Sequence, residues 1–132
     1  MARKRHLSRI AVMQVLFERG YREIDDKKSL RKNIEELGNV DEEFAQTLLE
    51  GSLSMEDELK KEIELKAPEW SFDRMDPIAR PVLIMGAFEL LYANDAPPAV
   101  VMNECIEIAK EYGTDETGKF VNGVLNALAK GL

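Results

Sequence analysis

Apolar residues recur at helical spacing along most of the chain, and no stretch alternates apolar and polar residues as a half-buried strand does. Residues 10–17, Ile-Ala-Val-Met-Gln-Val-Leu-Phe, are apolar at seven of eight positions. A helix that is apolar on all sides is surrounded by other elements. The pattern therefore predicts a helix over residues 3–19 that runs through the middle of an all-helical domain.

Two amphipathic helices are expected next. Ser29 is a suitable N-cap for a short helix that Gly38 ends, and its apolar residues are Leu30, Ile34 and Leu37. Asp41 can cap a longer helix that continues until Pro68. The apolar positions of this longer helix are Phe44, Leu48, Leu49, Met55, Leu59 and Ile63. The charged residues 56–64 predict an ordinary solvated face on it.

A turn is expected to follow, with Trp70 and Phe72 tucked under the domain as core residues. Asp76 can then cap a fourth helix with Pro77 at its first position. Pro81 would remove one backbone hydrogen bond from the interior of that helix, so either a kink or a helix start near Pro81 is expected.

The last two helices have the clearest boundaries in the sequence. Pro98 suits a first helical position, and Gly113 suits a left-handed residue that ends the same helix. The first of the two has apolar positions at Val101, Cys105, Ile108, Ala109 and Tyr112, and the second at Phe120, Val121, Val124, Leu125 and Leu128. Each helix therefore has one face to bury.

The length of 132 residues with 45% hydrophobic composition predicts one domain over residues 1–132, a compact fold of six or seven helices. No run approaches the roughly 18 apolar residues of a membrane span, and the start of the chain lacks the apolar stretch of a secretory signal. We therefore expect a cytoplasmic protein that does not enter the membrane.

Catalytic and metal chemistry are poorly represented in the composition. The chain has one cysteine and one histidine, which leaves no intramolecular disulfide, no thiolate metal cluster and few acid–base constellations. Cys105 lies on an apolar helix stripe and is expected to be a small buried hydrophobe. No glycine-rich phosphate loop is present. We expect a protein that is not an enzyme, with no cofactor, metal site or catalytic residue.

Charge is distributed unevenly along the chain. The formal net charge is −7, but residues 1–9 carry +4 and no acid, from Arg3, Lys4, Arg5 and Arg9. These four cations and His6 are scattered around the first turns of the predicted helix, so we expect those turns to protrude as an exposed basic segment. Such a segment can bind nucleic acid, whereas the acidic remainder of the chain disfavours promiscuous binding or faces a basic protein.

Sequence motifs in the second half of the chain resemble those of the NusB family of transcription antitermination factors. The residues that carry the resemblance are Asp76-Pro-Ile-Ala-Arg80, Phe88-Glu-Leu-Leu-Tyr92, Pro97-Pro98, Asn103-Glu104 and Lys119-Phe-Val-Asn-Gly-Val-Leu125. A weaker, collinear resemblance covers Arg3 to Phe17. The resemblance implies an all-α fold of two perpendicular three-helix sub-bundles. It also implies binding of single-stranded boxA RNA together with the ribosomal protein NusE, in a complex that helps RNA polymerase read through terminators in ribosomal RNA operons.

The same resemblance implies two groups of RNA-binding residues. The arginine-rich start of the family corresponds to Arg3, Lys4, Arg5 and Arg9, with His6 where another arginine is usual. The start of the last helix supplies Glu116, Lys119 and Phe120. Glu116 is suited to accept a hydrogen bond from a base, and Lys119 to contact phosphate. Phe120 has core spacing, which leaves burial and base stacking equally open.

The sequence departs from the family in the fourth helix. Ile84 and Phe88 stand where members commonly have arginine and tyrosine, and Pro81 is unusual there. Two alternatives to the antitermination role stay open: a helical adaptor or dimerisation module, and a stand-alone relative of the front domain of ribosomal RNA cytosine methyltransferases. The family contains monomers and dimers, so a homodimer is open as well.

Overall fold

The structure is a computed structural model that describes residues 2–131. Within that range the chain forms seven α-helices, a 3₁₀ turn η1 and a π-helical segment η2, with no strand. In chain order they are α1 (Ala2–Arg19), α2 (Asp26–Leu37), α3 (Glu42–Ser54), α4 (Glu56–Lys66), η1 (Phe72–Arg74), α5 (Ala79–Phe88), η2 (Glu89–Ala93), α6 (Pro98–Tyr112) and α7 (Asp115–Lys130). The predicted all-helical fold is confirmed.

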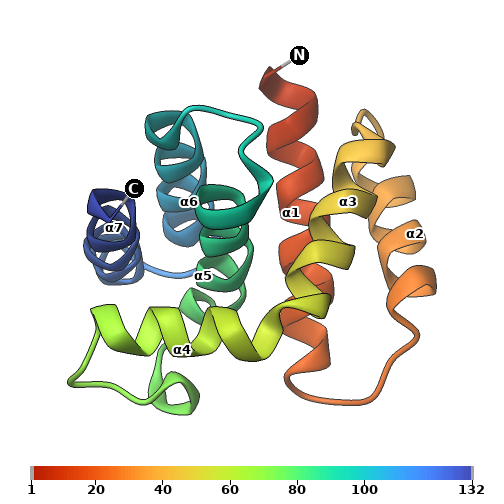
Figure 1. Ribbon diagram of the computed structural model, residues 1–132. Coiled ribbons are helices and arrows are strands. Elements are labelled where there is room, and N and C mark those ends of the chain that lie inside the picture. The colour runs from red at the N-terminus through yellow and green to blue at the C-terminus, as the bar shows by residue number, and fades with distance from the viewer. Residues whose placement is uncertain (1, 132) are drawn as a thin grey trace.

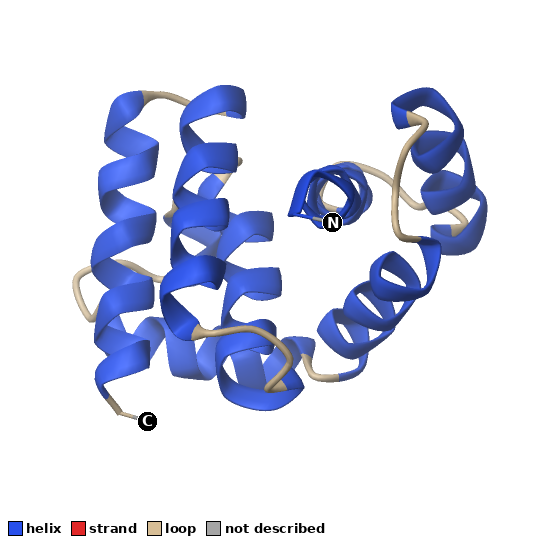
Figure 2. Ribbon diagram, turned by 90° about the horizontal axis from the view of Figure 1, so that it is seen from above, coloured by secondary structure: helices blue, strands red, loops and turns tan. Residues whose placement is uncertain are grey.

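The helices form two groups that share α1 and α5 at their junction. α1 packs against α2, α3 and α5, whereas α7 packs mainly against α6 and α5. α7 is viewed almost along its axis in Figure 1, and α1 in Figure 2, so the two groups run crosswise. The apolar run Ile10–Leu16 of α1 is buried apart from Gln14, as its all-round apolar pattern predicts.

The prediction of one long helix from Asp41 to Pro68 is wrong, because the chain forms two helices that meet at Met55. Asp41 caps α3 as predicted, with its carboxylate accepting from the Phe44 N–H. Met55 then leaves the helical conformation, with φ −112° and ψ 14°, and α4 begins at Glu56. The break allows α3 to pack against α1 while α4 turns toward α5 and α7. Helical spacing on both sides of the break hides it from the sequence.

The structure corrects two details of the predicted helix ends: the N-cap of α2 and the backbone conformation of Gly113. α2 is capped by Asp25, whose carboxylate accepts from the Lys28 N–H, and Ser29 lies inside the helix, where its hydroxyl donates to Glu18. Gly38 ends this helix with φ +86°, as expected. Gly113 also ends α6, but with φ −112° it is not left-handed. A Cβ there would lie 2.7 Å from Thr117 Oγ1 and 2.8 Å from the Ala109 carbonyl oxygen, so packing, not a positive φ, requires the glycine.

Pro81 causes no kink, because α5 starts at Ala79 and Pro81 falls in its first turn, where an N–H has no helical partner. The expected start near Pro81 is therefore correct. The predicted first helical position of Pro77 is wrong, because Ile78 is the N-cap and Pro77 lies in the turn before α5; Asp76 Oδ1 accepts from the N–H groups of Ile78 and Ala79 in this turn.

The expectation that both aromatic residues before α5 are core is half wrong. Phe72 is buried, but the Trp70 side chain is 50% exposed. Cys105 is fully buried as expected, and burial raises the pKa of its thiol, so the thiol stays protonated at neutral pH. No helix among residues 2–131 is both long enough and apolar enough to cross a membrane.

Candidate nucleic-acid interface

The first turn of α1 presents two exposed cations, Arg3 and Lys4, at the free end of the helix at the top of Figure 1. Among the described residues neither side chain forms an ion pair. Arg5 is different, because it lies 3.0 Å from Asp95 Oδ2 and 4.0 Å from Asp41 Oδ2 and its guanidinium stands 4.5 Å over the Phe44 ring. Its side chain is still 37% exposed, so it can turn part of its hydrogen-bonding capacity outward.

Arg9 was expected in the exposed basic segment, and the structure corrects this. Its side chain is 2% exposed and forms a two-bond fork to Glu89, with Nε donating to Oε2 at 2.7 Å and Nη2 to Oε1 at 2.9 Å. Nη1 donates to Glu104 Oε1 at 3.0 Å. Burial opposes the charged guanidinium, but the hydrogen bonds and the charge of Glu89 outweigh it and raise the pKa of Arg9 above its usual value. Arg9 therefore joins α1 to η2 and α6 as a charged cross-link.

His6 is also buried, at 4% exposure, and not part of a protruding surface. Its Nδ1 lies 3.2 Å from Glu104 Oε2, and its Nε2 lies 3.8 Å from Glu107 Oε1. These three side chains are the group of possible metal ligands that the described residues bring together. Glu104 contacts both Arg9 and His6, so these side chains link α1 to α6.

Carboxylates surround the basic start of α1 in three dimensions. Five acids from other elements face it: Asp41, Glu89, Asp95, Glu104 and Glu107. The formal +4 of residues 1–9 is thus locally compensated, and the unpaired positive charge is reduced mainly to Arg3 and Lys4. The acids fall between positions 41 and 107 in the sequence, so the local count could not include them.

The second predicted group lies at the start of α7. Glu116 and Lys119 are exposed and form an ion pair of 3.4 Å, one helical turn apart. Phe120 is half-buried: it packs against the core on one side and meets the edge of Trp70 at a ring-centroid distance of 6.4 Å and an interplanar angle of 78°. Part of the Phe120 ring is therefore core and part is accessible, so base stacking by this residue stays a prediction.

The α7 terminus is held rigidly by its own cap. Thr114 and Thr117 form a reciprocal capping box, and the Thr117 hydroxyl also donates to Asp76 Oδ2 at 3.3 Å. Asp76 therefore ties the starts of α5 and α7 together. This link fixes the position of the exposed residues in the first turns of α7.

Sequence reasoning missed one cation beside this group. A Cβ on Gly118 would lie 2.5 Å from Lys110 Cγ and 2.9 Å from its Cε, so the aliphatic stem of Lys110 runs across the glycine. Lys110 is exposed, and its ammonium is thereby held near the start of α7. Spacing along the sequence does not show that α6 brings this lysine to the start of α7.

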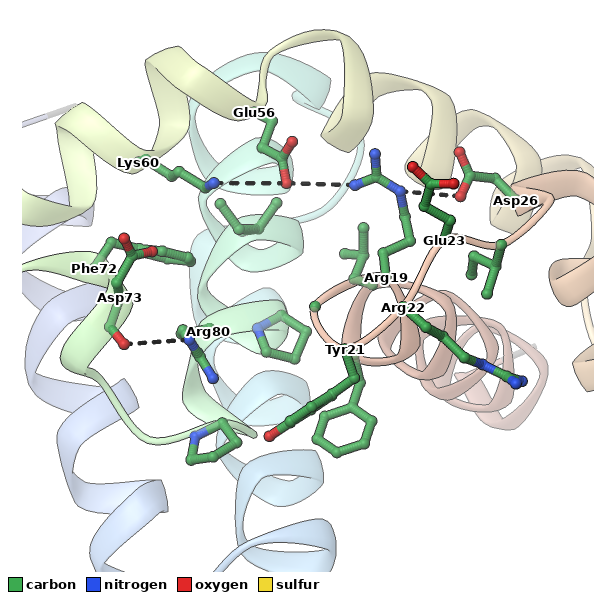
Figure 3. A pocket seen from close by; sticks show the side chains of 17 residues that line it. Arg19, Tyr21, Arg22, Glu23, Asp26, Glu56, Lys60, Phe72, Asp73 and Arg80 are labelled. Atoms are coloured by element: carbon green, nitrogen blue, oxygen red, sulfur yellow. Dashed lines mark hydrogen bonds and ion pairs between the residues drawn. The ribbon is translucent and has the colours of Figure 1, made fainter.

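A separate cavity of about 790 Å³ lies at the other end of α1, between α4 and the start of α5 (Figure 3). Its cations are engaged within the chain: Arg19 pairs with Asp26 at 3.0 Å and with Glu56 at 3.5 Å, and Arg80 donates to the Asp73 carbonyl at 3.2 Å. Ile84 and Pro81, two of the positions that depart from the family pattern, line this cavity. It contains none of the predicted RNA-binding residues.

Residues 6–130 match the profile of the NusB family. The chain belongs to the NusB family. Relatives named transcription antitermination protein NusB include one from Nitratiruptor sp., 38% identical over 96% of this chain and 91% of that protein. Another, from Desulfitobacterium hafniense, is 36% identical over 96% of this chain and 88% of that protein.

Solved structures of the NusB family share the fold at comparable identity. A crystal structure of antitermination factors NusB and NusE in complex with double-stranded RNA matches with a TM-score of 0.89 and 27% identity, covering all of both chains. A crystal form of T. maritima NusB matches with a TM-score of 0.84 and 33% identity over 95% of this chain and 89% of that one. The two crossed helical groups are therefore the arrangement of this family.

Proposed function

We propose that this protein is a non-enzymatic transcription antitermination factor that acts in the cytoplasm as a single domain. It binds boxA-type single-stranded RNA together with the ribosomal protein NusE, and the complex promotes read-through by RNA polymerase in ribosomal RNA operons. Support comes from family membership over residues 6–130 and from a match of TM-score 0.89 to a NusB, NusE and RNA complex.

We assign direct RNA contacts to the exposed residues of the two groups. Arg3 and Lys4 contact phosphate, Arg5 contributes with its outward part, and Lys119 and Phe120 bind at the start of α7 with Glu116 accepting from a base. His6 and Arg9 act indirectly, because the contact of His6 with Glu104 and the ion pairs of Arg9 with Glu89 and Glu104 hold the first turns of α1 in place.

The test is a titration of labelled boxA RNA, followed by fluorescence anisotropy with and without purified NusE. We expect NusE to raise the affinity, and the paired change Arg3→Ala with Lys4→Ala to weaken binding while the protein stays folded. A scrambled RNA and a double-stranded boxA RNA serve as controls. Equal binding of boxA and scrambled RNA in the presence of NusE would contradict the proposal.

The adaptor alternative makes a different prediction for the same preparation. A module that works only through protein contacts would bind NusE or itself without any effect of RNA. Light scattering with and without RNA separates these cases, since a homodimer formed through the basic segment would dissociate when RNA binds.

A further inference from the structure

Trp70, the single tryptophan of the chain, lies in the segment between α4 and η1 and is half exposed. A tryptophan carries the largest apolar surface of any side chain, so its partial exposure at a fixed position needs a reason. Among the described residues the indole N–H has no hydrogen-bond partner.

The exposure does not come from a loosely held segment. The Trp70 N–H donates to the Ala67 carbonyl at 3.0 Å, and the Phe72 N–H donates to Glu64 Oε2 at 2.7 Å. The Phe72 ring is buried beneath Lys60, whose ammonium lies 5.3 Å from the ring centroid. The backbone is thus anchored on both sides of Trp70, which presents the indole in a defined orientation.

The indole meets Phe120 edge-on, and this contact joins it to the start of α7. The two ring centroids are 6.4 Å apart and the ring planes meet at 78°. The accessible surfaces of the two rings therefore face different directions. Such a pair can support a flat group without rearrangement. Trp70 therefore continues the surface that already contains Phe120.

Two lysines lie farther around the start of α7 from this aromatic pair. Lys119 precedes Phe120 in α7 and is exposed, and Lys110 crosses Gly118 from α6. With 100° between successive residues, Gly118, Lys119, Glu116 and Phe120 follow one another around the first turns of α7. The order around the helix is therefore the two lysines, then an acid, then the aromatic rings, with Gly118 about 160° from Phe120.

We propose that Trp70 stacks on a base of the bound single-stranded RNA, beside Phe120, and that Lys119, and Lys110 farther around α7, contact phosphates of the same strand. Aromatic side chains beside basic residues are the usual platform for unpaired bases. The inference rests on the proposed RNA-binding function and adds to it a contact from the α4–η1 segment.

Intrinsic fluorescence tests the stacking directly, because Trp70 is the single tryptophan of the chain and is therefore the source of its tryptophan emission. Titration with unlabelled boxA RNA in the presence of NusE is expected to quench the emission and to protect Trp70 from acrylamide; a tryptophan-free NusE keeps the signal specific. Trp70→Ala should weaken RNA binding by about 5- to 150-fold, whereas Trp70→Phe should retain most of the affinity.

Tyr21→Ala is the matched control, since Tyr21 is also exposed and also packs on a phenylalanine, Phe17, at 5.0 Å. The RNA affinity of this variant should stay within about twofold of the wild-type affinity. Urea unfolding of each variant shows that the fold persists. If RNA binds but Trp70 emission, acrylamide access and the Trp70→Ala affinity do not change, the stacking inference is overturned and the proposed function stands. If wild-type protein with NusE binds no RNA, both are overturned.

Discussion

Arg9 lies on the side of α1 that meets η2 and α6, where Glu89 and Glu104 accept hydrogen bonds from its guanidinium. Its position among other cations in the sequence suggested a phosphate contact. A buried ion pair is instead a structural constraint, because removal of one member leaves the other charged and without water. His6 is likewise buried, beside Glu104. At the scale of single residues, burial decides which cations can reach RNA.

We therefore expect Arg9→Ala to lower the free energy of unfolding by about 3–5 kcal/mol, because Glu89 would stay buried without its counter-charge. Urea denaturation at neutral pH measures this. Arg3→Ala is the control, since Arg3 is exposed and its loss should change stability by no more than about 0.5 kcal/mol. A loss below about 1 kcal/mol for Arg9→Ala would show that Glu89 regains water in the variant.

At the scale of elements, the boundary between α3 and α4 depends on a close approach between helices. Gly51, one turn before the break at Met55, faces the Phe88 ring at the end of α5. A Cβ on Gly51 would lie 2.0–2.6 Å from three atoms of that ring, far inside van der Waals contact. A glycine at this position lets α3 pack against α5 before the chain turns into α4.

Gly51→Ala is expected to lower the free energy of unfolding by about 1–2 kcal/mol, because Phe88 must move and this outweighs the better helix propensity of alanine. Gly123→Ala is the matched control: Gly123 lies exposed in α7, and a Cβ there would meet nothing within 4 Å. That change should raise stability by about 0.5–1 kcal/mol. Thermal and urea unfolding measure both, and a stabilised Gly51→Ala would show that the Phe88 ring moves easily.

At the scale of the whole molecule, the proposed cationic contacts with RNA come from two separate places. Arg3 and Lys4 stand at the free end of α1, whereas Lys110 and Lys119 lie near the start of α7, in the other helical group. The acids between positions 41 and 107 neutralise the rest of the basic segment. A strand that covers both places must therefore cross the junction of the two groups.

Arg5 is paired with Asp95 and releases few counterions, so the four exposed cations Arg3, Lys4, Lys110 and Lys119 set the salt dependence. The logarithm of affinity for single-stranded RNA should fall with the logarithm of salt concentration at a slope of about −2.8. Arg3→Ala with Lys4→Ala should bring the slope to about −1.4, measured by anisotropy titrations at several salt concentrations. Lys27→Ala with Lys28→Ala removes the same charge from the exposed face of α2 and should leave the slope unchanged. Equal slopes for the two double variants would contradict the assigned contacts.

Much of the fold could be predicted because its signals are local. Apolar spacing indicated α1, α6 and α7, and the structure has the predicted N-cap Asp41 on α3 and the predicted first residue Pro98 in α6. The break at Met55 escaped prediction because apolar spacing continues across it, and the exposure of Trp70 escaped because an aromatic residue in a turn is usually core.

Residue type, residue spacing and sequence motifs were sufficient to predict the helical class, the family and the regions where RNA contacts should be sought. These properties depend on neighbours within one or two helical turns. The availability of each charged or aromatic side chain depended on partners far away in sequence. Glu89 and Glu104 withdraw Arg9 and His6 from solvent, whereas Gly118 and Phe120 hold Lys110 and Trp70 at the surface. Such pairings arise when helices meet, because burial and electrostatic compensation depend on distance in space.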